Sequence, residues 1–185
     1  MEIAQIVRRV AKVVVTDDPL RFAESRNLLG DVFFQVDVLH TIDDRRPQQH
    51  QSIGFGAGPL AAVAFASGSA ATLAVFTLAA AGGRVVCSSD CYHGTAKQLR
   101  EILPRWGGSV EFVDTTDLDA TRQALQPGAT LLWVETPSNP LLRVSDLAAL
   151  DALAQERGAL LGCDNTFASP VLQQPLALGA DLVMH

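Results

Sequence analysis

Cysteine is scarce in this chain of 185 residues, and its spacing excludes two common uses. Cys87, Cys91 and Cys163 form no Cys-x-x-Cys pair and have no paired histidines nearby. An odd number of cysteines in this arrangement argues against a disulfide framework and against a structural zinc site. We therefore expect no metal site and a reducing compartment.

Basic residues are also few. Fourteen lysines and arginines stand against twenty acidic residues, for a net charge of −6. A nucleic-acid or anionic-membrane surface needs clustered basic side chains, so neither partner is expected. Only two of the basic residues, Lys12 and Lys97, are lysines.

The chain lacks a clean membrane-spanning run. The longest apolar stretch, from Leu60 to Ala81, is interrupted by Ser67-Gly68-Ser69. A buried strand that leads into a buried helix explains this pattern better than a membrane span. The first fifteen residues also lack the apolar core and small-residue cleavage site of a secretory signal peptide. These absences favour a cytoplasmic protein.

Short apolar segments alternate with helical patterns from residue 58 onward. With 48% hydrophobic and 18% charged residues, the chain can fill one globular core. The predicted strands are 61–66, 84–89, 109–114, 130–136, 159–164 and 181–185. The predicted helices are 69–81, 95–106, 118–125 and 145–157. This alternation indicates an α/β fold, in which a mostly parallel sheet carries helices on both faces.

Residues 1–57 differ in composition from the rest. They hold 15 of the 34 charged residues and show no regular strand or helix period. We expect this segment to stay outside the sheet, with residues 58–185 forming the α/β domain.

Polar loops follow four of the predicted strands, where ligands collect in α/β sheets. The first of these loops is Ser67-Gly68-Ser69, which leads into a predicted helix. The amides of such a helix start can bind a phosphate, with glycine permitting close approach. The alternative is an ordinary serine N-cap, and the tripeptide alone leaves both open.

The second loop contains Tyr92, the only tyrosine of the chain. Its ring could stack on a planar cofactor and its hydroxyl could handle a proton, or it could be a half-buried packing residue. His93 has no partner at metal-ligand spacing and is expected to be solvated or hydrogen-bonded. Asp90 and Cys91 are interpreted as a turn residue and a packing residue.

The last two loops add acids and amides. Asp164 ends an apolar strand, so its carboxylate needs a partner such as a protonated ring nitrogen. The alternative is an Asx-turn into Asn165 and Thr166. Glu135 and Asn139 could bind polar ligand groups or shape a proline-rich turn.

Together these segments resemble one family. The motifs AFASGSAAT, DCYHGT, VETPSNPLLRVSDL and CDNTFASPVLQQPLALGADLVMH are similar, in order, to those of the pyridoxal-phosphate-dependent enzymes of Cys/Met metabolism. The resemblance covers residues 56–185, about 70% of the chain. It implies part of the fold-type I large domain, with pyridoxal 5′-phosphate as cofactor. The segment NPLLRV is more similar to the corresponding segment of cystathionine γ-synthases than to that of γ-lyases.

The resemblance assigns roles to individual residues. Gly68 and Ser69 match the pair whose amides hold the cofactor phosphate, although the family more often has methionine at Ser69. Tyr92 matches the tyrosine that stacks on the pyridine ring and is a candidate proton acceptor in catalysis.

A second group surrounds the pyridine ring. Asp164 matches the acid paired with the pyridine nitrogen, and Asn139 and Thr166 match polar residues near the ring. Glu135 matches an acid of the same motif whose role the resemblance leaves open.

Two family motifs have no counterpart. The lysine that carries the cofactor belongs to an S-x-T-K motif expected directly after His185, and neither Lys12 nor Lys97 is a convincing substitute. The segment Y-S-R-x-x-N-P-T, which reaches the neighbouring subunit's phosphate, is missing from residues 1–57. The resemblance therefore implies that residues 58–185 are a partial cofactor-binding domain, inactive as an isolated chain.

Two functional hypotheses stay open. One is a transsulfuration enzyme that exchanges the γ-substituent of O-succinyl- or O-acetylhomoserine for cysteine, with γ-lyase or O-acylhomoserine sulfhydrylase as alternatives within the family. The other is a non-catalytic fragment that acts as an interaction protein. The resemblance also suggests a homodimer or homotetramer. A nucleotide-binding Rossmann domain is excluded because no G-x-G-x-x-G follows a strand.

Overall fold

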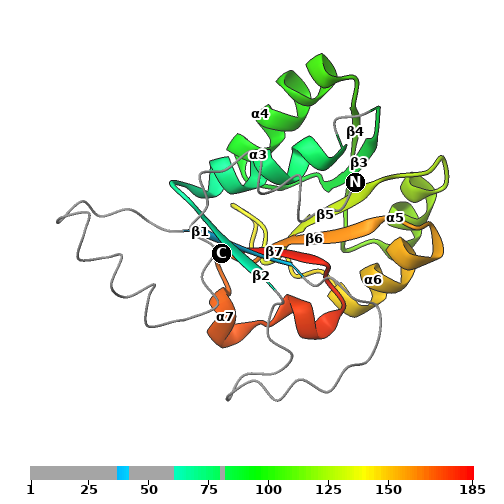
Figure 1. The fold of residues 1–185 in the computed structure, drawn as a ribbon. Helices are drawn as coiled ribbons and strands as arrows, with labels where there is room; N and C mark the ends of the chain where they lie inside the picture. The colour runs from blue at the N-terminus through cyan, green and yellow to red at the C-terminus, as the bar shows by residue number, and fades with distance from the viewer. Residues whose placement is uncertain (1–36, 42–60, 80–81) are drawn as a thin grey trace.

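A computed structural model describes residues 37–41, 61–79 and 82–185, which form one sheet with helices on both faces (Figure 1). The strands are β1 (Asp37–Thr41), β2 (Ala61–Phe65), β3 (Arg84–Ser88), β4 (Ser109–Val113), β5 (Leu131–Glu135), β6 (Leu160–Asp164) and β7 (Leu182–Met184). The α-helices are α3 (Gly68–Ala79), α4 (His93–Glu101), α5 (Leu118–Leu125), α6 (Leu147–Glu156) and α7 (Ser169–Leu172). Two short 3₁₀ helices are η1 (Leu103–Trp106) and η2 (Pro175–Leu178).

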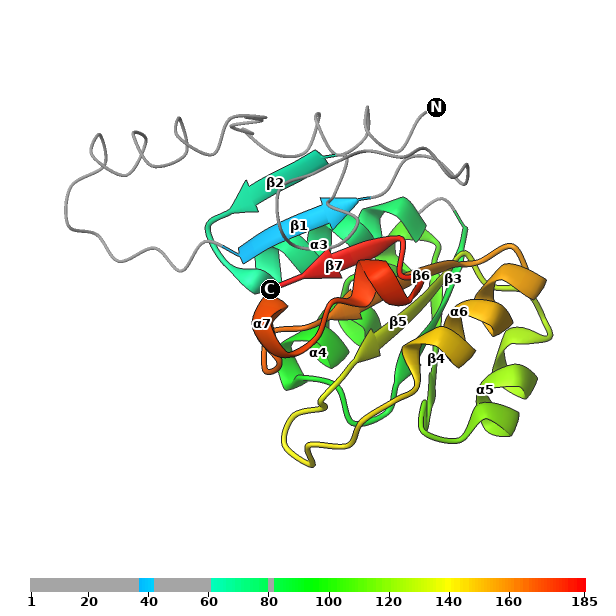
Figure 2. The ribbon, with the colours of Figure 1, turned by 90° about the horizontal axis from the view of Figure 1, so that it is seen from below.

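The sheet has the strand order β2-β1-β7-β6-β5-β3-β4. The five strands from β7 to β4 are parallel, which confirms the predicted fold class. β1 pairs antiparallel with both β2 and β7, so β2 points the same way as β7 (Figure 2). The carboxyl ends of β2, β3, β5, β6 and β7 consequently share one edge.

The expectation that residues 1–57 stay outside the sheet is wrong for β1. Residues 37–41 lie between β2 and β7, with Leu39 opposite Met184. Without β1, β7 would present unpaired amides and carbonyls at an edge. The rest of residues 1–57 lies outside the described part of the chain.

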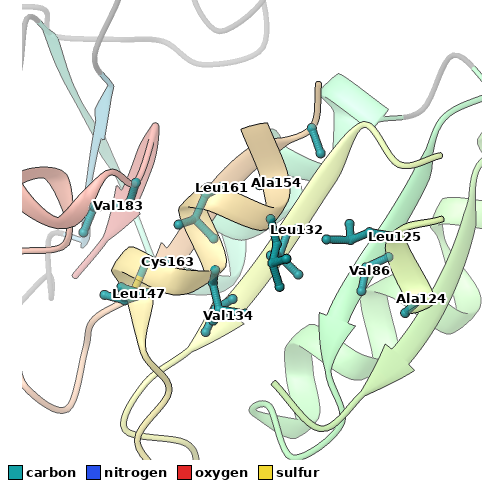
Figure 3. Close-up of a cluster of buried hydrophobic side chains, with 14 residues drawn as sticks. Val86, Ala124, Leu125, Leu132, Val134, Leu147, Ala154, Leu161, Cys163 and Val183 are labelled. Carbon is teal, nitrogen blue, oxygen red and sulfur yellow. The ribbon is translucent and has the colours of Figure 1, made fainter. Parts of the chain in front are cut away.

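Two hydrophobic cores cover the two faces. Along β5, Leu131 and Trp133 face the core under α3 and α4, while Leu132 and Val134 face the core under α5 and α6. Figure 3 shows the second core, in which side chains from the sheet and from α5 and α6 meet. Burial on both faces explains why β5 is apolar at consecutive positions.

Helix boundaries follow local chemistry. Asp117 caps α5 by accepting N–H bonds from Asp119 and Ala120, so the helix begins where the sequence predicts. The predicted helix 95–106 is instead α4 followed by η1, which begins next to Pro104. No described helix has the length and apolar character needed to cross a bilayer.

Gly162 of β6 lies against the ring of Trp133 on β5. A Cβ at this position would come within 2.6 Å of the Trp133 ring. Both residues are fully enclosed by the sheet and the helices, so the ring has little room to move. The absence of a side chain at residue 162 thus sets the packing of the largest core residue.

We expect Gly162→Ala to lower the free energy of unfolding by about 1–3 kcal/mol, the usual cost of overpacking a core. Urea unfolding followed by tryptophan fluorescence measures the change. Gln126→Ala, at an exposed position beyond α5, is the control and should be neutral. An unchanged midpoint for Gly162→Ala would contradict the packing described here.

Candidate functional site

The shared carboxyl edge of the sheet contains a pocket of about 300 Å³. It lies where the chain leaves β2, β3, β5, β6 and β7, beside the first turn of α3. The pocket is lined by Ala66, Ser67, Gly68, Ser69, Thr72, Tyr92, Thr95, Asn139, Asp164, Thr166 and Met184. None of these lining residues is lysine or arginine, so among them backbone amides are the candidate groups for binding an anion.

Ser67 caps α3. Its Oγ accepts the N–H of Ala70 at 3.2 Å, which confirms the N-cap reading of this tripeptide. The cap does not use the amides of Gly68 and Ser69, the first two of the helix, which have no carbonyl partner within it. Gln98 of α4 donates to the Ser69 carbonyl at 2.8 Å and so ties the helix start to α4. Capping and an anion-binding helix start are therefore compatible here.

Tyr92 lies at the mouth of the pocket, immediately before α4. Its side chain is 48% exposed, whereas its backbone N–H donates to Glu135 Oε2 at 2.6 Å. The backbone is thus held by a residue of β5 while the ring stays accessible to a ligand. This half-exposed ring next to a polar pocket supports the stacking interpretation over a purely structural one.

Glu135, at the end of β5, is 5% exposed. Burial, together with the nearby charges of Asp164 and Asp90, raises the pKa of its carboxyl group to about 7. Hydrogen bonds from the Tyr92 and Asn139 amides act in the opposite direction by favouring the carboxylate. Glu135 therefore joins the loops that follow β3 and β5.

Asp164 stands beside Glu135 on the neighbouring strand and is also buried. Its Oδ1 accepts the Thr166 N–H at 3.1 Å and the Thr166 hydroxyl at 2.7 Å. The Asx-turn predicted from the sequence is therefore present, and it fixes the carboxylate at the pocket wall. Two adjacent buried carboxyl groups make this end of the pocket favourable for a cation.

Hydrogen bonds among buried hydroxyl groups connect these loops. Ser88 and Thr115 lie 2.9 Å apart, as do Thr115 and Ser145, measured between hydroxyl oxygens. The Ser88 hydroxyl also accepts the Glu135 N–H at 3.3 Å, and the Thr136 hydroxyl accepts the Ser145 N–H at 3.0 Å. The ends of three parallel strands are thereby held in one arrangement.

A second set of bonds holds the loop that carries Asn139. Ser138 donates its hydroxyl to Asp90 at 2.5 Å and accepts the Arg143 N–H at 3.1 Å. The Arg143 guanidinium pairs with Asp114. The hydrogen bond from the Thr116 hydroxyl, together with this ion pair, lowers the pKa of Asp114. The loops after β3, β4 and β5 thus form one connected unit.

The structure brings together all the residues that the sequence analysis predicted to bind the cofactor. Each of them lines the single pocket described above, namely Gly68, Ser69, Tyr92, Asn139, Asp164 and Thr166. His93 is exposed and Cys91 is packed in the core under α3 and α4, as the sequence predicts. Asp90 lies in a turn and accepts the bond from Ser138.

Sequence reasoning missed several residues of the same pocket. Thr72, Thr95 and Met184 line it without standing in the polar loops. Thr95 lies in the first turn of α4, a position that could have marked it as a pocket residue. Thr72 lies in the second turn of α3, where its hydroxyl donates to the Gly68 carbonyl at 2.8 Å. The described residues hold no cluster of three or more metal-ligating side chains.

The two ends of the pocket suit one kind of molecule. Free helix amides at Gly68 and Ser69 favour an anion, the Asp164 end favours a cation, and Tyr92 offers an aromatic face near both. A planar, protonated heteroaromatic ring that carries a phosphate satisfies all three features. The residues present therefore fit pyridoxal 5′-phosphate.

Comparison with known proteins points in the same direction. Residues 51–185 match the model of a family described as Cys/Met metabolism PLP-dependent enzyme. A probable cystathionine gamma-synthase of Herpetosiphon aurantiacus is 42% identical over 124 residues, which are 67% of this chain and 39% of that protein. A cystathionine gamma-lyase of Bacillus subtilis is 43% identical over 68% of this chain and 33% of its own length.

A solved structure is also similar. Cystathionine gamma-lyase from Lactobacillus plantarum, complexed with L-serine, superposes with a TM-score of 0.62 at 45% sequence identity. The match covers 64% of this chain and 31% of that one. The chain thus spans about a third of the length of the relatives it matches.

Proposed function

Because the chain belongs to the Cys/Met metabolism PLP-dependent enzymes, we propose that its pocket binds pyridoxal 5′-phosphate for a transsulfuration reaction. The observation that carries this proposal is the convergence of the α3 amides, Tyr92 and Asp164 in one pocket. In such enzymes the bound cofactor acts as an electron sink for amino-acid carbanions. The chain's own residues provide binding, orientation and proton handling.

The helix start holds the phosphate in this proposal. The Gly68 and Ser69 amides donate to the phosphate oxygens, and the positive end of the α3 dipole adds to the attraction. No side chain is needed for these two bonds, so serine serves as well as methionine at position 69. The Thr72 and Thr95 hydroxyls line the same pocket.

Tyr92 and Asp164 orient the ring. Asp164 pairs with the protonated pyridine nitrogen, and the two bonds from Thr166 keep its carboxylate in place. Tyr92 stacks on the ring face and offers its hydroxyl as a proton acceptor near the substrate. Asn139, held in place by Ser138 and its neighbours, and Thr166 contact polar substituents of the ring.

We further propose that the whole enzyme to which such a domain belongs catalyses a γ-replacement reaction. In that reaction an activated homoserine ester and cysteine give cystathionine and a free carboxylate such as succinate or acetate. The segment Asn139–Val144 favours this synthase activity, and relatives named as γ-synthases and γ-lyases are both consistent with chemistry at the γ-carbon. Assays with O-succinylhomoserine plus cysteine, and separately with cystathionine alone, distinguish the two.

Location and assembly are proposed on more general grounds. Three unpaired, buried cysteines support a reducing compartment such as the cytoplasm, where methionine biosynthesis takes place. Val171 and Leu172 of α7 are 85% and 81% exposed, which supports contact with a further protein surface, as in a homodimer or homotetramer.

Equilibrium titration with pyridoxal 5′-phosphate tests the proposed binding. Difference absorbance should show saturable binding at one site per chain, and inorganic phosphate should compete. Pyridoxal, which lacks the phosphate, should bind at least tenfold more weakly because it forgoes charge-assisted hydrogen bonds worth about 1.5–3 kcal/mol each. Equal affinity for the two compounds would contradict the phosphate site at α3.

Lys97 should not become attached to the cofactor. It is the one lysine among the described residues, is exposed on α4 and does not line the pocket. We expect the 185-residue chain, assayed alone, to bind the cofactor without turnover. Lys97→Ala should bind as tightly as wild type.

Borohydride reduction followed by peptide mass spectrometry measures whether the cofactor is attached to Lys97. Two results together would contradict the expectation: the cofactor's mass on the Lys97 peptide of the wild type, and turnover of a homoserine ester that disappears in Lys97→Ala.

A further inference from the structure

We infer that Glu135 and Gly94 are positioning residues that set the pose of the Tyr92 ring, Glu135 by holding the Tyr92 backbone and Gly94 by leaving space for the ring. Neither residue lines the pocket. The inference deepens the proposed function and rests on it only for the effect on cofactor binding. The link between these residues and Tyr92 can be tested without any cofactor.

The first contact is the hydrogen bond from the Tyr92 N–H to Glu135 Oε2, at 2.6 Å. Tyr92 directly precedes α4, and no side chain caps that helix. This bond therefore ties the residue before α4 directly to the end of β5, between residues 43 positions apart. Glu135 itself is fixed by burial and by the Ser88 hydroxyl that accepts its N–H.

The second contact is steric. A Cβ on Gly94 would lie 2.5 Å from Tyr92 Cε1 and 3.1 Å from Cδ1. The Tyr92 ring thus occupies the volume that any side chain at residue 94 would fill. Because the ring is half exposed, it can swing away at low cost, so a side chain at residue 94 displaces the ring and leaves the fold intact.

The bond to Glu135 also introduces a pH dependence. The groups that face its carboxyl are Asp90 from the loop before α4, Asp164 and Cys163 from β6, and Cys87 from β3. Burial, together with the acidic neighbours, raises the pKa of Glu135 to about 7, so the carboxylate is lost as pH falls through this value. The hydrogen bond from the Tyr92 amide to Glu135 should weaken over the same pH range.

Tyrosine labelling gives a direct readout because Tyr92 is the only tyrosine in the chain. Protein labelled with ¹³C,¹⁵N-tyrosine should show one tyrosine amide signal and one set of ring signals. We expect the amide proton to move upfield as pH is lowered through about 7, and to lie upfield at all pH values in Glu135→Gln. The control Glu156→Gln, at an exposed position of α6, should titrate as wild type does.

Three further variants separate the effects of Glu135, His93 and Gly94 on the Tyr92 signals. His93→Asn keeps the transition if Glu135 causes it and removes it if the neighbouring imidazole does. Gly94→Ala should move the ring signals while the melting temperature stays at or above that of wild type, since alanine favours the helix. Lys97→Ala, on the same helix, should leave the ring signals unchanged.

Cofactor titration completes the test. Glu135→Gln and Gly94→Ala should each weaken pyridoxal 5′-phosphate binding about tenfold, and wild-type binding should weaken below pH 7. A Tyr92 amide that ignores Glu135→Gln, or ring signals and affinity unchanged in Gly94→Ala, would overturn the inference. If wild type binds no cofactor, the proposed function fails, and the signals of Tyr92 still decide whether Glu135 and Gly94 position it.

Discussion

Asp164→Asn should weaken pyridoxal 5′-phosphate binding by about ten- to hundredfold while the protein stays folded. The variant removes the negative charge that pairs with the pyridine nitrogen, and charge-assisted hydrogen bonds contribute about 1.5–3 kcal/mol. The asparagine oxygen can still accept both bonds from Thr166, so the local turn survives. Titration by difference absorbance measures the affinity.

Stability should change in a different way from affinity. Replacing a buried carboxylate beside Glu135 with a neutral amide relieves repulsion, so we expect the free energy of unfolding to fall by less than about 1 kcal/mol or to rise. Asp119→Asn, at an exposed position in the first turn of α5, is the matched charge control and should bind as wild type does. Equal affinity in Asp164→Asn and wild type would exclude the proposed pairing.

Ser69→Asp should weaken cofactor binding by about ten- to hundredfold, through repulsion between the new carboxylate and the phosphate. The same change should stabilise α3 by about 0.3–1 kcal/mol, because the first turn of this helix holds no acidic residue and its dipole favours one. Binding and stability are thus expected to move in opposite directions, which a general folding defect cannot produce.

Ser69→Met is the control for the same position. It keeps the backbone amide and adds no charge, so its affinity should match that of wild type within about threefold. A loss with methionine as large as that with aspartate would mean that the serine hydroxyl, rather than the amide, binds the phosphate. Thermal unfolding and difference absorbance on both variants give the comparison.

The regular part of the fold was predictable because its signals are local. β5 and β6 are apolar at consecutive positions since both of their faces are covered, and Asp117 marks the start of α5. β1 was not predictable in this way. Its five residues mix polar and apolar side chains within a segment rich in charged residues, and they pair with β2 on one side and β7 on the other.

In the candidate site, too, some residues could be predicted from the sequence and others could not. Asp164 and Tyr92 stand in polar loops at strand ends, so the sequence nominates them directly. The contact between Glu135 and Tyr92 joins residues of two different strand ends, and the role of Gly94 depends on where a ring lies. The first contact cannot be derived from spacing along the chain, because it arises only when the parallel strands align their carboxyl ends. The second is local in sequence and depends on how the Tyr92 ring is oriented.

The most direct test of the central claim is a crystal structure of the 185-residue chain grown with pyridoxal 5′-phosphate. We expect the phosphate at the amides of Gly68 and Ser69, the ring against Tyr92, and the pyridine nitrogen facing Asp164. Cofactor bound elsewhere on the chain, or bound in this pocket with its phosphate away from the start of α3, would contradict it.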